Sequence, residues 1–170
     1  MKRNTALLLL TMIAGSAFAG RPDAPPPELA RLRILANDLT GVVERRDRTT
    51  GTWSPSEPVD VAGREILRGR YIENGLRMQF TGEPRPSEVR MLWSYDVFQK
   101  RYRLVIMDDL VGTMDVFEQS SEEPLAFTNA YGNRLTVHPL GETKVRMEVE
   151  ATKDGGKTWT EVMRVTLTAK

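Results

Sequence analysis

The chain has 170 residues, of which 40% are hydrophobic, with 24 Lys and Arg against 23 Asp and Glu and no cysteine. This length suits one ordinary hydrophobic core and is hardly enough for two, and the lack of cysteine excludes disulfides and thiolate metal sites. The balanced charge gives no support to binding of nucleic acid or of an anionic membrane, because that affinity rests on concentrated Lys and Arg.

The first nineteen residues follow the plan of a cleavable secretory signal. Lys2 and Arg3 precede an apolar run over residues 6–14, and the small residues Ala17-Phe18-Ala19 precede Gly20. The apolar run is too short to span a bilayer. We therefore expect a signal peptide over residues 1–19, cleavage near Ala19-Gly20, and a periplasmic or secreted bacterial protein with no membrane span in the mature chain. The alternatives are a retained N-terminal anchor or a core helix.

Residues 20–27 are expected to form a tether between the cleavage site and the domain. The run Pro25-Pro26-Pro27 cannot start a compact element, because each proline lacks a backbone donor and fixes φ. A short helix is expected next, over residues 28–37, with Pro27 at a suitable first position. Its apolar residues give one helical face: Leu29, Leu32, Ile34, Leu35 and Ala36.

From Leu39 onward the pattern changes to short alternating runs separated by turn residues at a spacing of about ten, which predicts an all-β fold. We expect strands over residues 39–46, 59–68, 70–80, 88–97, 101–108, 112–119, 126–130, 134–138, 144–151 and 159–168. Strands with hairpin-length links pair with their neighbours in sequence, and closure removes exposed edges. The sequence thus predicts a single up-and-down antiparallel barrel of about ten strands, lipocalin-like, with one short N-terminal helix, over residues 28–170.

The octet Thr152-Lys153-Asp154-Gly155-Gly156-Lys157-Thr158-Trp159 lies between the last two expected strands. Asp with paired glycines between alternating runs indicates a hairpin turn. One dry face is expected from Val145, Met147, Val149 and Ala151, facing Trp159, Met163, Val165 and Leu167, with an interruption at Glu161. The octet is similar to the Asp-box of sialidase propellers, but it occurs once, whereas a propeller needs repeats. We interpret it as a structural turn.

Several segments, in order, resemble an exported bacterial domain family of unknown function: Ile66-Leu67-Arg68-Gly69-Arg70-Tyr71-Ile72-Glu73, Ser94-Tyr95-Asp96, Arg101-Tyr102, Asp108, Gly112-Thr113-Met114 and the closing Asp154-Gly155-Gly156-Lys157-Thr158-Trp159. Members are thought to fold as lipocalin-like or fatty-acid-binding-protein-like barrels, so the resemblance implies that fold and no agreed activity. The Gly-x-Trp common near the first strand of members is here Gly41-Val42-Val43, and the tryptophan common in a later strand is replaced near Ile106. The resemblance therefore implies an altered pocket.

Polar candidates for chemistry are few. The single histidine, His138, precedes Pro139 and is expected to be a hydrogen-bonded turn residue, with a single axial haem ligand as the alternative. Carboxylates gather at Asp108, Asp109, Asp115 and Glu118, and paired carboxylates can form an acid–base pair or a cation site. Alternation puts Asp108 and Asp109 on opposite faces, and Asp115 and Glu118 likewise, so solvated carboxylates are favoured. No catalytic residue, metal or cofactor is assigned.

The strongest candidates for function are apolar. Stripes on consecutive strands must point into the barrel, where they either fill it or line a cavity. We hypothesise noncatalytic binding of a small hydrophobic ligand; the alternative is a protein–protein interaction module that contacts an envelope protein, and an enzyme of unknown type is third. The expected wall residues of the lumen are Met78, Met91, Trp93, Tyr95, Tyr102, Ile106 and Met114.

Overall fold

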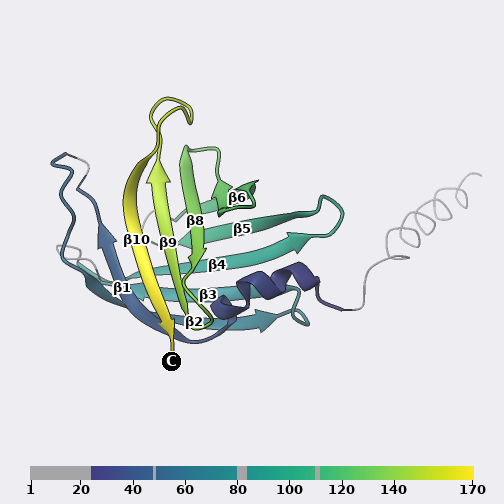
Figure 1. The fold of residues 1–170 in the computed structure, drawn as a ribbon. Helices are drawn as coiled ribbons and strands as arrows, with labels where there is room; N and C mark the ends of the chain where they lie inside the picture. The colour runs from purple at the N-terminus through teal and green to yellow at the C-terminus, as the bar shows by residue number, and fades with distance from the viewer. Residues whose placement is uncertain (1–23, 48, 80–83, 110–111) are drawn as a thin grey trace, which may run out of the picture.

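The computed structural model describes residues 24–47, 49–79, 84–109 and 112–170. The expected signal peptide and residues 20–23 of the expected tether lie outside these residues. Ten antiparallel strands close into one barrel, in which every strand pairs with its neighbours in sequence and the first pairs with the last. Figure 1 shows β8, β9 and β10 crossing steeply in front of β2 to β5. The predicted all-β up-and-down barrel is confirmed.

The elements follow the expected order, with one helix of the 3-10 type ahead of the strands. They are η1 (Pro27–Ala36), β1 (Leu39–Arg45), β2 (Glu57–Ile66), β3 (Tyr71–Met78), β4 (Ser87–Asp96), β5 (Arg101–Asp108), β6 (Met114–Ser121), β7 (Leu125–Thr128), β8 (Asn133–Pro139), β9 (Lys144–Ala151) and β10 (Thr160–Ala169). Among the described residues, no helix has both the length and the apolar character needed to cross a membrane.

Alternation along each strand separates an inner from an outer face, as expected for strands half in contact with a core. In β4, Met91 and Trp93 are buried and pair with Asn74 and Ile72 of β3 on the same inner face. The core centres on Trp93, whose ring lies edge-on to Phe127 at 5.5 Å between centroids. The apolar stripes of the sequence therefore form a packed interior.

Helix η1 lies across β2, β3 and β4 and closes one end of the barrel (Figure 1). Its apolar face, Leu29, Leu32 and Leu35, is buried. Gly63 of β2 makes this close approach feasible: a Cβ at that position would lie 2.3 Å from the backbone oxygens of both Leu35 and Asn37. Only a residue without a side chain lets the two backbones meet here.

A buried chain of hydrogen bonds fixes the helix to the barrel. The Nε1–H of Trp93 donates to Oδ1 of Asn74 at 2.7 Å, and Nδ2 of Asn74 donates to the carbonyl of Leu35 at 2.5 Å. Near the other end of the helix, the hydroxyl of Tyr102 donates to the carbonyl of Glu28 at 2.7 Å. Because buried polar groups are costly when unpaired, these bonds specify how η1 is seated.

The last hairpin corrects one prediction. Met163, Val165 and Leu167 pair with Val149, Met147 and Val145 on the inner face, but the register shifts between Glu161 and Met163. This bulge adds a residue to one strand and reverses the alternation beyond it. Trp159 therefore lies on the outer side, with the guanidinium of Arg134 4.5 Å from its ring centroid, and is not part of the dry face.

The closing octet is a hydrogen-bonded turn, as predicted. Oδ1 of Asp154 accepts from the backbone N–H of Thr158 at 2.9 Å and from the hydroxyl of Thr152 at 2.7 Å, and Oδ2 accepts from the hydroxyl of Thr158 at 2.6 Å. Both glycines have positive φ, 71° at Gly155 and 90° at Gly156. These bonds lower the pKa of Asp154 to about 2.

Acid is expected to weaken this turn. The ordinary pKa of the carboxyl is 3.8 and the folded value is about 2, so its stabilising effect is complete above pH 4 and is lost as pH falls through 2. The difference in free energy of unfolding between wild type and Asp154→Asn should thus be constant at pH 5 to 7 and shrink toward pH 2. Lys153→Gln, in the same turn, should show no such trend. A constant Asp154→Asn difference down to pH 2 would refute this assignment.

Candidate ligand site at the open end of the barrel

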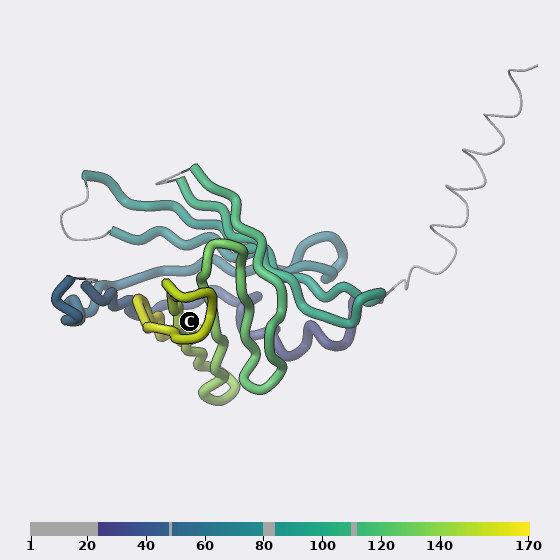
Figure 2. The backbone as a smooth tube through the Cα atoms, turned by 90° about the horizontal axis from the view of Figure 1, so that it is seen from above, coloured from purple at the N-terminus to yellow at the C-terminus, as the bar shows by residue number. Residues whose placement is uncertain are grey.

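The two ends of the barrel differ in how they are closed. An up-and-down barrel places alternate connections at opposite ends. One end is formed by η1 and by the turns that join β2 to β3, β4 to β5, β6 to β7 and β8 to β9; we call it the helix end. The other end is formed by the C-terminal ends of β1, β3, β5, β7 and β9 and by the described residues that follow them. Figure 2 shows the β1–β2 side of this end away from η1.

Most of the wall residues expected from the sequence lie in the core. Met78, Met91, Trp93 and Tyr102 are buried, and Tyr95 and Ile106 are partly buried and pack against that core. All six face inward and belong to, or pack against, one core cluster that also contains the buried leucines of η1. Their place in a filled interior makes them supports for a site elsewhere in the barrel.

The prediction for Met114 is wrong. This side chain is 66% exposed. It pairs with Met107 of β5, the outward neighbour of Ile106, and cross-strand partners share a face. On β6 the inward residues are Asp115 and Phe117, so Met114 lies on the outer wall.

The two tyrosines expected to give polar contacts to a ligand serve the fold. Their rings lie 5.0 Å apart in an edge-to-face arrangement. Burial raises the pKa of both phenols, and the charge of Glu28 raises that of Tyr95 further, so both stay protonated at neutral pH. The Tyr102 hydroxyl is already bonded to the helix.

Two adjoining cavities lie at the end away from the helix, which we call the open end. The larger holds about 810 Å³, and the second, about 500 Å³, lies among the β1–β2, β7–β8 and β9–β10 connections. They share Arg46, Asp47, Asn133 and Val162. The wall of the larger cavity includes Arg45, Trp53, Asn133, Val149 and Met163.

Three of these residues form a row across neighbouring strands. Arg45 of β1 pairs with Met163 of β10, which pairs with Val149 of β9. Val149 and Met163 continue the inner face of the buried Met147 and Val165, and they are only partly buried. A flexible thioether and a valine side chain therefore border the cavity beside a guanidinium.

The β1–β2 connection, which supplies much of the larger cavity, is held by its own hydrogen bonds. Ser54 donates its backbone N–H to the carbonyl of Arg45 at 2.7 Å and accepts from the Arg45 N–H through its hydroxyl at 2.9 Å. The Asp47 carboxylate accepts from the N–H groups of Thr50 and Thr49, which lowers its pKa. This part of the wall is preformed.

Trp53 is held on the rim of the larger cavity by stacking. The guanidinium of Arg164 lies 4.2 Å from its ring centroid, and Glu44 fixes that guanidinium with an ion pair of 2.6 Å. The hydrogen bond between Glu44 and Arg164 is the main cause that lowers the pKa of Glu44. The rim thus has an aromatic side chain in a defined orientation.

The carboxylates singled out in the sequence are divided between the two faces. Asp115 points inward and accepts from Nδ2 of Asn129 at 3.4 Å, whereas Glu118 points outward and pairs with Arg101 at 3.1 Å. Asp109 accepts from the Glu88 backbone and pairs with Arg85, and both interactions lower its pKa. The predicted split of Asp115 and Glu118 is confirmed. Across residues 24–47, 49–79, 84–109 and 112–170, no group of three or more His, Cys, Asp or Glu could hold a metal ion.

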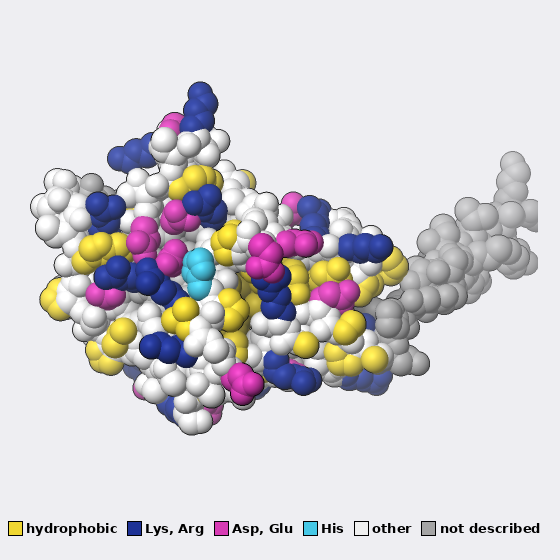
Figure 3. Space-filling view, viewed as in Figure 1, with side chains coloured by type: hydrophobic (Ala, Val, Ile, Leu, Met, Phe, Trp, Pro, Cys, Tyr) yellow, Lys and Arg dark blue, Asp and Glu magenta, His cyan; other side chains and the backbone are white. Residues whose placement is uncertain are grey.

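His138 lies on the outer wall, which corrects its prediction as a turn residue. Strand β8 continues to Pro139, and Nε2 of His138 is 3.3 Å from the carboxylate of Glu148. Figure 3 shows it among charged side chains on the face of β8 to β10. An imidazole there points away from the lumen, so it cannot ligate a haem inside the barrel.

Two further cavities, of about 570 and 560 Å³, lie on the outer wall over β2 to β4 and over β7 to β9. Several of the charged side chains on their rims are paired with each other. Glu73 holds Arg64 at 2.5 Å and Arg90 at 3.3 Å over the first, and Arg134 holds Glu150 at 2.6 Å over the second. These grooves are therefore weaker candidates than the open end.

Reasoning from the sequence missed Arg45, Trp53 and Asn133 as site residues. It placed Val149 and Met163 on a dry face without marking them as a wall. The available signal was the β1–β2 connection, where Trp53 stands within the polar run Thr52-Trp53-Ser54. No protein-family model matches this chain, and no curated protein matches its sequence. What the protein does must be inferred from its own residues and geometry.

Proposed function

We propose that this protein is an exported, noncatalytic binding protein that holds a small amphipathic molecule at the open end of its barrel. On this proposal it belongs to the exported barrel family that its motifs resemble. The supporting observation is unequal filling: η1 and the core occupy the helix end, whereas Val149 and Met163 border a cavity of about 810 Å³. This volume lies within the roughly 300 to 1,000 Å³ of typical ligand sites, and the wall combines apolar side chains with a larger share of polar ones than such sites usually have.

The wall suggests the chemistry of the ligand. Met163 and Val149 offer apolar contact to a short aliphatic or flat group, and Trp53, whose ring is stacked on Arg164 of the outer face, borders the same cavity. Arg45 and the amide of Asn133 lie in the same wall, where an acidic or carbonyl headgroup would find a cation and a hydrogen-bond donor. An amphipathic anion is the class of ligand that fits best.

Dodecanoate is therefore expected to bind and to change the fluorescence of Trp53, whereas dodecyltrimethylammonium, of opposite charge, should not. Titration calorimetry gives the affinity, and the Trp53→Phe variant should lose the fluorescence change. Val149→Trp, which fills the cavity, should weaken binding at least about tenfold. Val116→Trp, on the outer wall at a residue that is 47% exposed, is the matched control and should leave binding unchanged.

Equal affinity of Val149→Trp and wild type would contradict the site. Failure of wild type to bind either compound, together with native mass spectrometry that finds no co-purifying small molecule, would contradict the function. That result would favour the alternative, a module that contacts another protein of the cell envelope.

A further inference from the structure

Two neighbouring turns at the helix end each expose one large apolar side chain. Leu67, between β2 and β3, is 68% exposed, and Phe98, between β4 and β5, is 82% exposed. Because β3 pairs with β4, the turns lie side by side, and Figure 2 shows both on the side where η1 begins. We call residues 67–70 and 97–100 the two tips.

The backbone of both tips is held in a region that ordinary side chains rarely adopt. φ is 50° at Leu67, 61° at Arg68 and 51° at Lys100. Glycine or asparagine takes this left-handed region at lower cost and is the usual choice in such turns. Strain of this kind clusters at functional sites, which makes the two tips candidates for a functional role.

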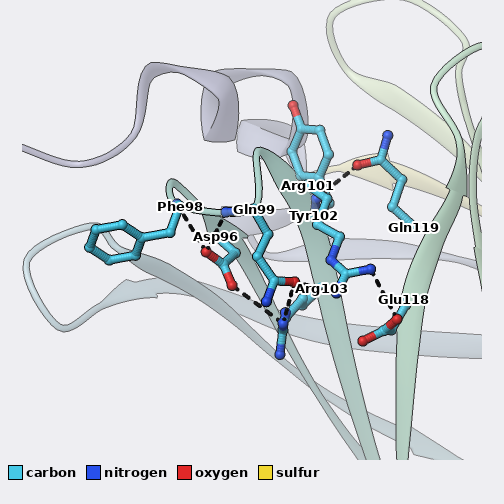
Figure 4. Close-up of polar contacts among 8 residues, drawn as sticks. All are labelled: Asp96, Phe98, Gln99, Arg101, Tyr102, Arg103, Glu118 and Gln119. Atoms are coloured by element: carbon cyan, nitrogen blue, oxygen red, sulfur yellow. Dashed lines mark hydrogen bonds and ion pairs between the residues drawn. The ribbon is translucent and has the colours of Figure 1, made fainter.

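The Phe98 tip is rigidly built. Oδ1 of Asp96 accepts from the backbone N–H groups of Gln99 and Phe98, both at 3.0 Å. The same carboxylate pairs with Arg103 at 3.3 Å, and Oε1 of Gln99 accepts from Arg103 at 2.9 Å. Figure 4 shows the Phe98 ring pointing away from this cluster. The hydrogen bonds and the ion pair fix the turn, so the Phe98 ring projects into solvent, where it can contact a partner.

The tips also concentrate positive charge, which the near-neutral charge of the whole chain conceals. Arg68, Arg70 and Lys100 form no ion pair with any residue of the described ranges. The next turn at this end is acidic: its Glu123 pairs with Arg31 of η1 at 2.9 Å, whereas the charges of Glu122 and of Glu28 in η1 act on Tyr95 and partly offset the cations of the tips. Exposed apolar groups flanked by free cations are typical of segments that lie in the interface of anionic bilayers.

We propose that the two tips dock the protein on an anionic lipid bilayer. Leu67 and Phe98 enter the headgroup layer, and the three cations contact lipid phosphates. The course of the chain supports this orientation: a Cβ at Gly69 would lie 2.9 Å from Cγ of Pro25, so the described chain enters the domain beside the first tip. The open end then faces away from the bilayer.

Labels at single cysteines test the geometry, since the chain has no cysteine of its own. An environment-sensitive fluorophore is attached to one cysteine at a time, in the variants Leu67→Cys, Phe98→Cys and Tyr131→Cys. The protein is recovered from a bacterial cell that exports it, and mass spectrometry identifies its N-terminus. Tyr131, at the open end, is 77% exposed and is the matched control. Vesicles of phosphatidylglycerol and phosphatidylcholine in equal parts should raise emission at 67 and 98 severalfold and leave 131 unchanged, and roughly 0.5 M salt should reduce the effect.

Partition measures the contribution of the tips directly. In sedimentation with the same vesicles, the double variant Leu67→Ser/Phe98→Ser should bind at least about tenfold more weakly than wild type, and Tyr131→Ser should bind as wild type does. Equal partition of the double variant and wild type would overturn the proposal. So would tip labels that respond equally to pure phosphatidylcholine, or that respond to envelope proteins and not to vesicles, since the partner would then be a neutral surface or a protein.

Discussion

Gly63→Ala is expected to lower the free energy of unfolding by about 3 kcal/mol, the upper range for overpacking a closed site. The added Cβ would lie 2.3 Å from the backbone oxygens of Leu35 and Asn37, and neither oxygen is at the end of a flexible side chain that could move aside. To relieve this contact, η1 must shift away from β2, which exposes part of its buried leucine face. Urea unfolding gives the stability, and hydrogen exchange in η1 reports the local loss.

Gly75→Ala is the matched control on the neighbouring strand. Gly75 pairs with Ala62 on the outer face, where a Cβ would meet nothing within 4 Å. Alanine there removes backbone freedom from the unfolded chain, so stability should rise by about 0.5 kcal/mol. Equal effects of the two substitutions would show that η1 does not rest on Gly63.

Asn74→Leu is expected to cost about 2 to 5 kcal/mol, although leucine has a similar size. The substitution leaves the Nε1–H of Trp93 and the carbonyl of Leu35 buried without partners. Each unpaired buried group costs roughly 1 to 3 kcal/mol. The loss should appear in urea unfolding and as a change in the emission of Trp93, which is fully buried in the wild type.

A double-mutant cycle separates this network from simple packing. Trp93→Phe removes the indole N–H donor. In that background, Asn74→Leu therefore leaves no indole N–H without a hydrogen-bond partner. The double variant should then be more stable than the sum of the single losses predicts, by about 1 kcal/mol or more. Strict additivity would mean that Asn74 and Trp93 do not act through a shared hydrogen bond.

The inner faces were predictable from sequence because the period of a strand is fixed at two residues. Ile72 and Leu76 of β3 and Met91 of β4 stand at every-second-residue positions of their strands, and each is buried inside the barrel. The closing turn was equally local: Asp154 and two glycines are sufficient to specify it, since they satisfy its backbone within eight residues. Local patterns of this kind need no knowledge of distant strands.

Errors arose where pairing with another strand decides the outcome. The alternation predicts Trp159 on the dry face, but the bulge before Met163 reverses the alternation, and a bulge depends on the partner strand. Met114 was assigned to the lumen, but its register with Met107 turns it outward. Register is a property of two paired strands. The hydrophobic alternation at the end of one strand therefore does not determine the register there.

By itself the sequence determined the all-β class, the number and order of the strands, the short helix and the closing turn, because periodicity and turn chemistry act between near neighbours. Only the tertiary structure decided where η1 lies, through Gly63 and Asn74, and hence which end of the barrel is filled. It also brought Arg45, Met163 and Val149 into one row and set Leu67 beside Phe98. These contacts follow from closure of the barrel, which brings together residues that are far apart in the chain. Both the proposed ligand binding and the proposed membrane docking depend on them.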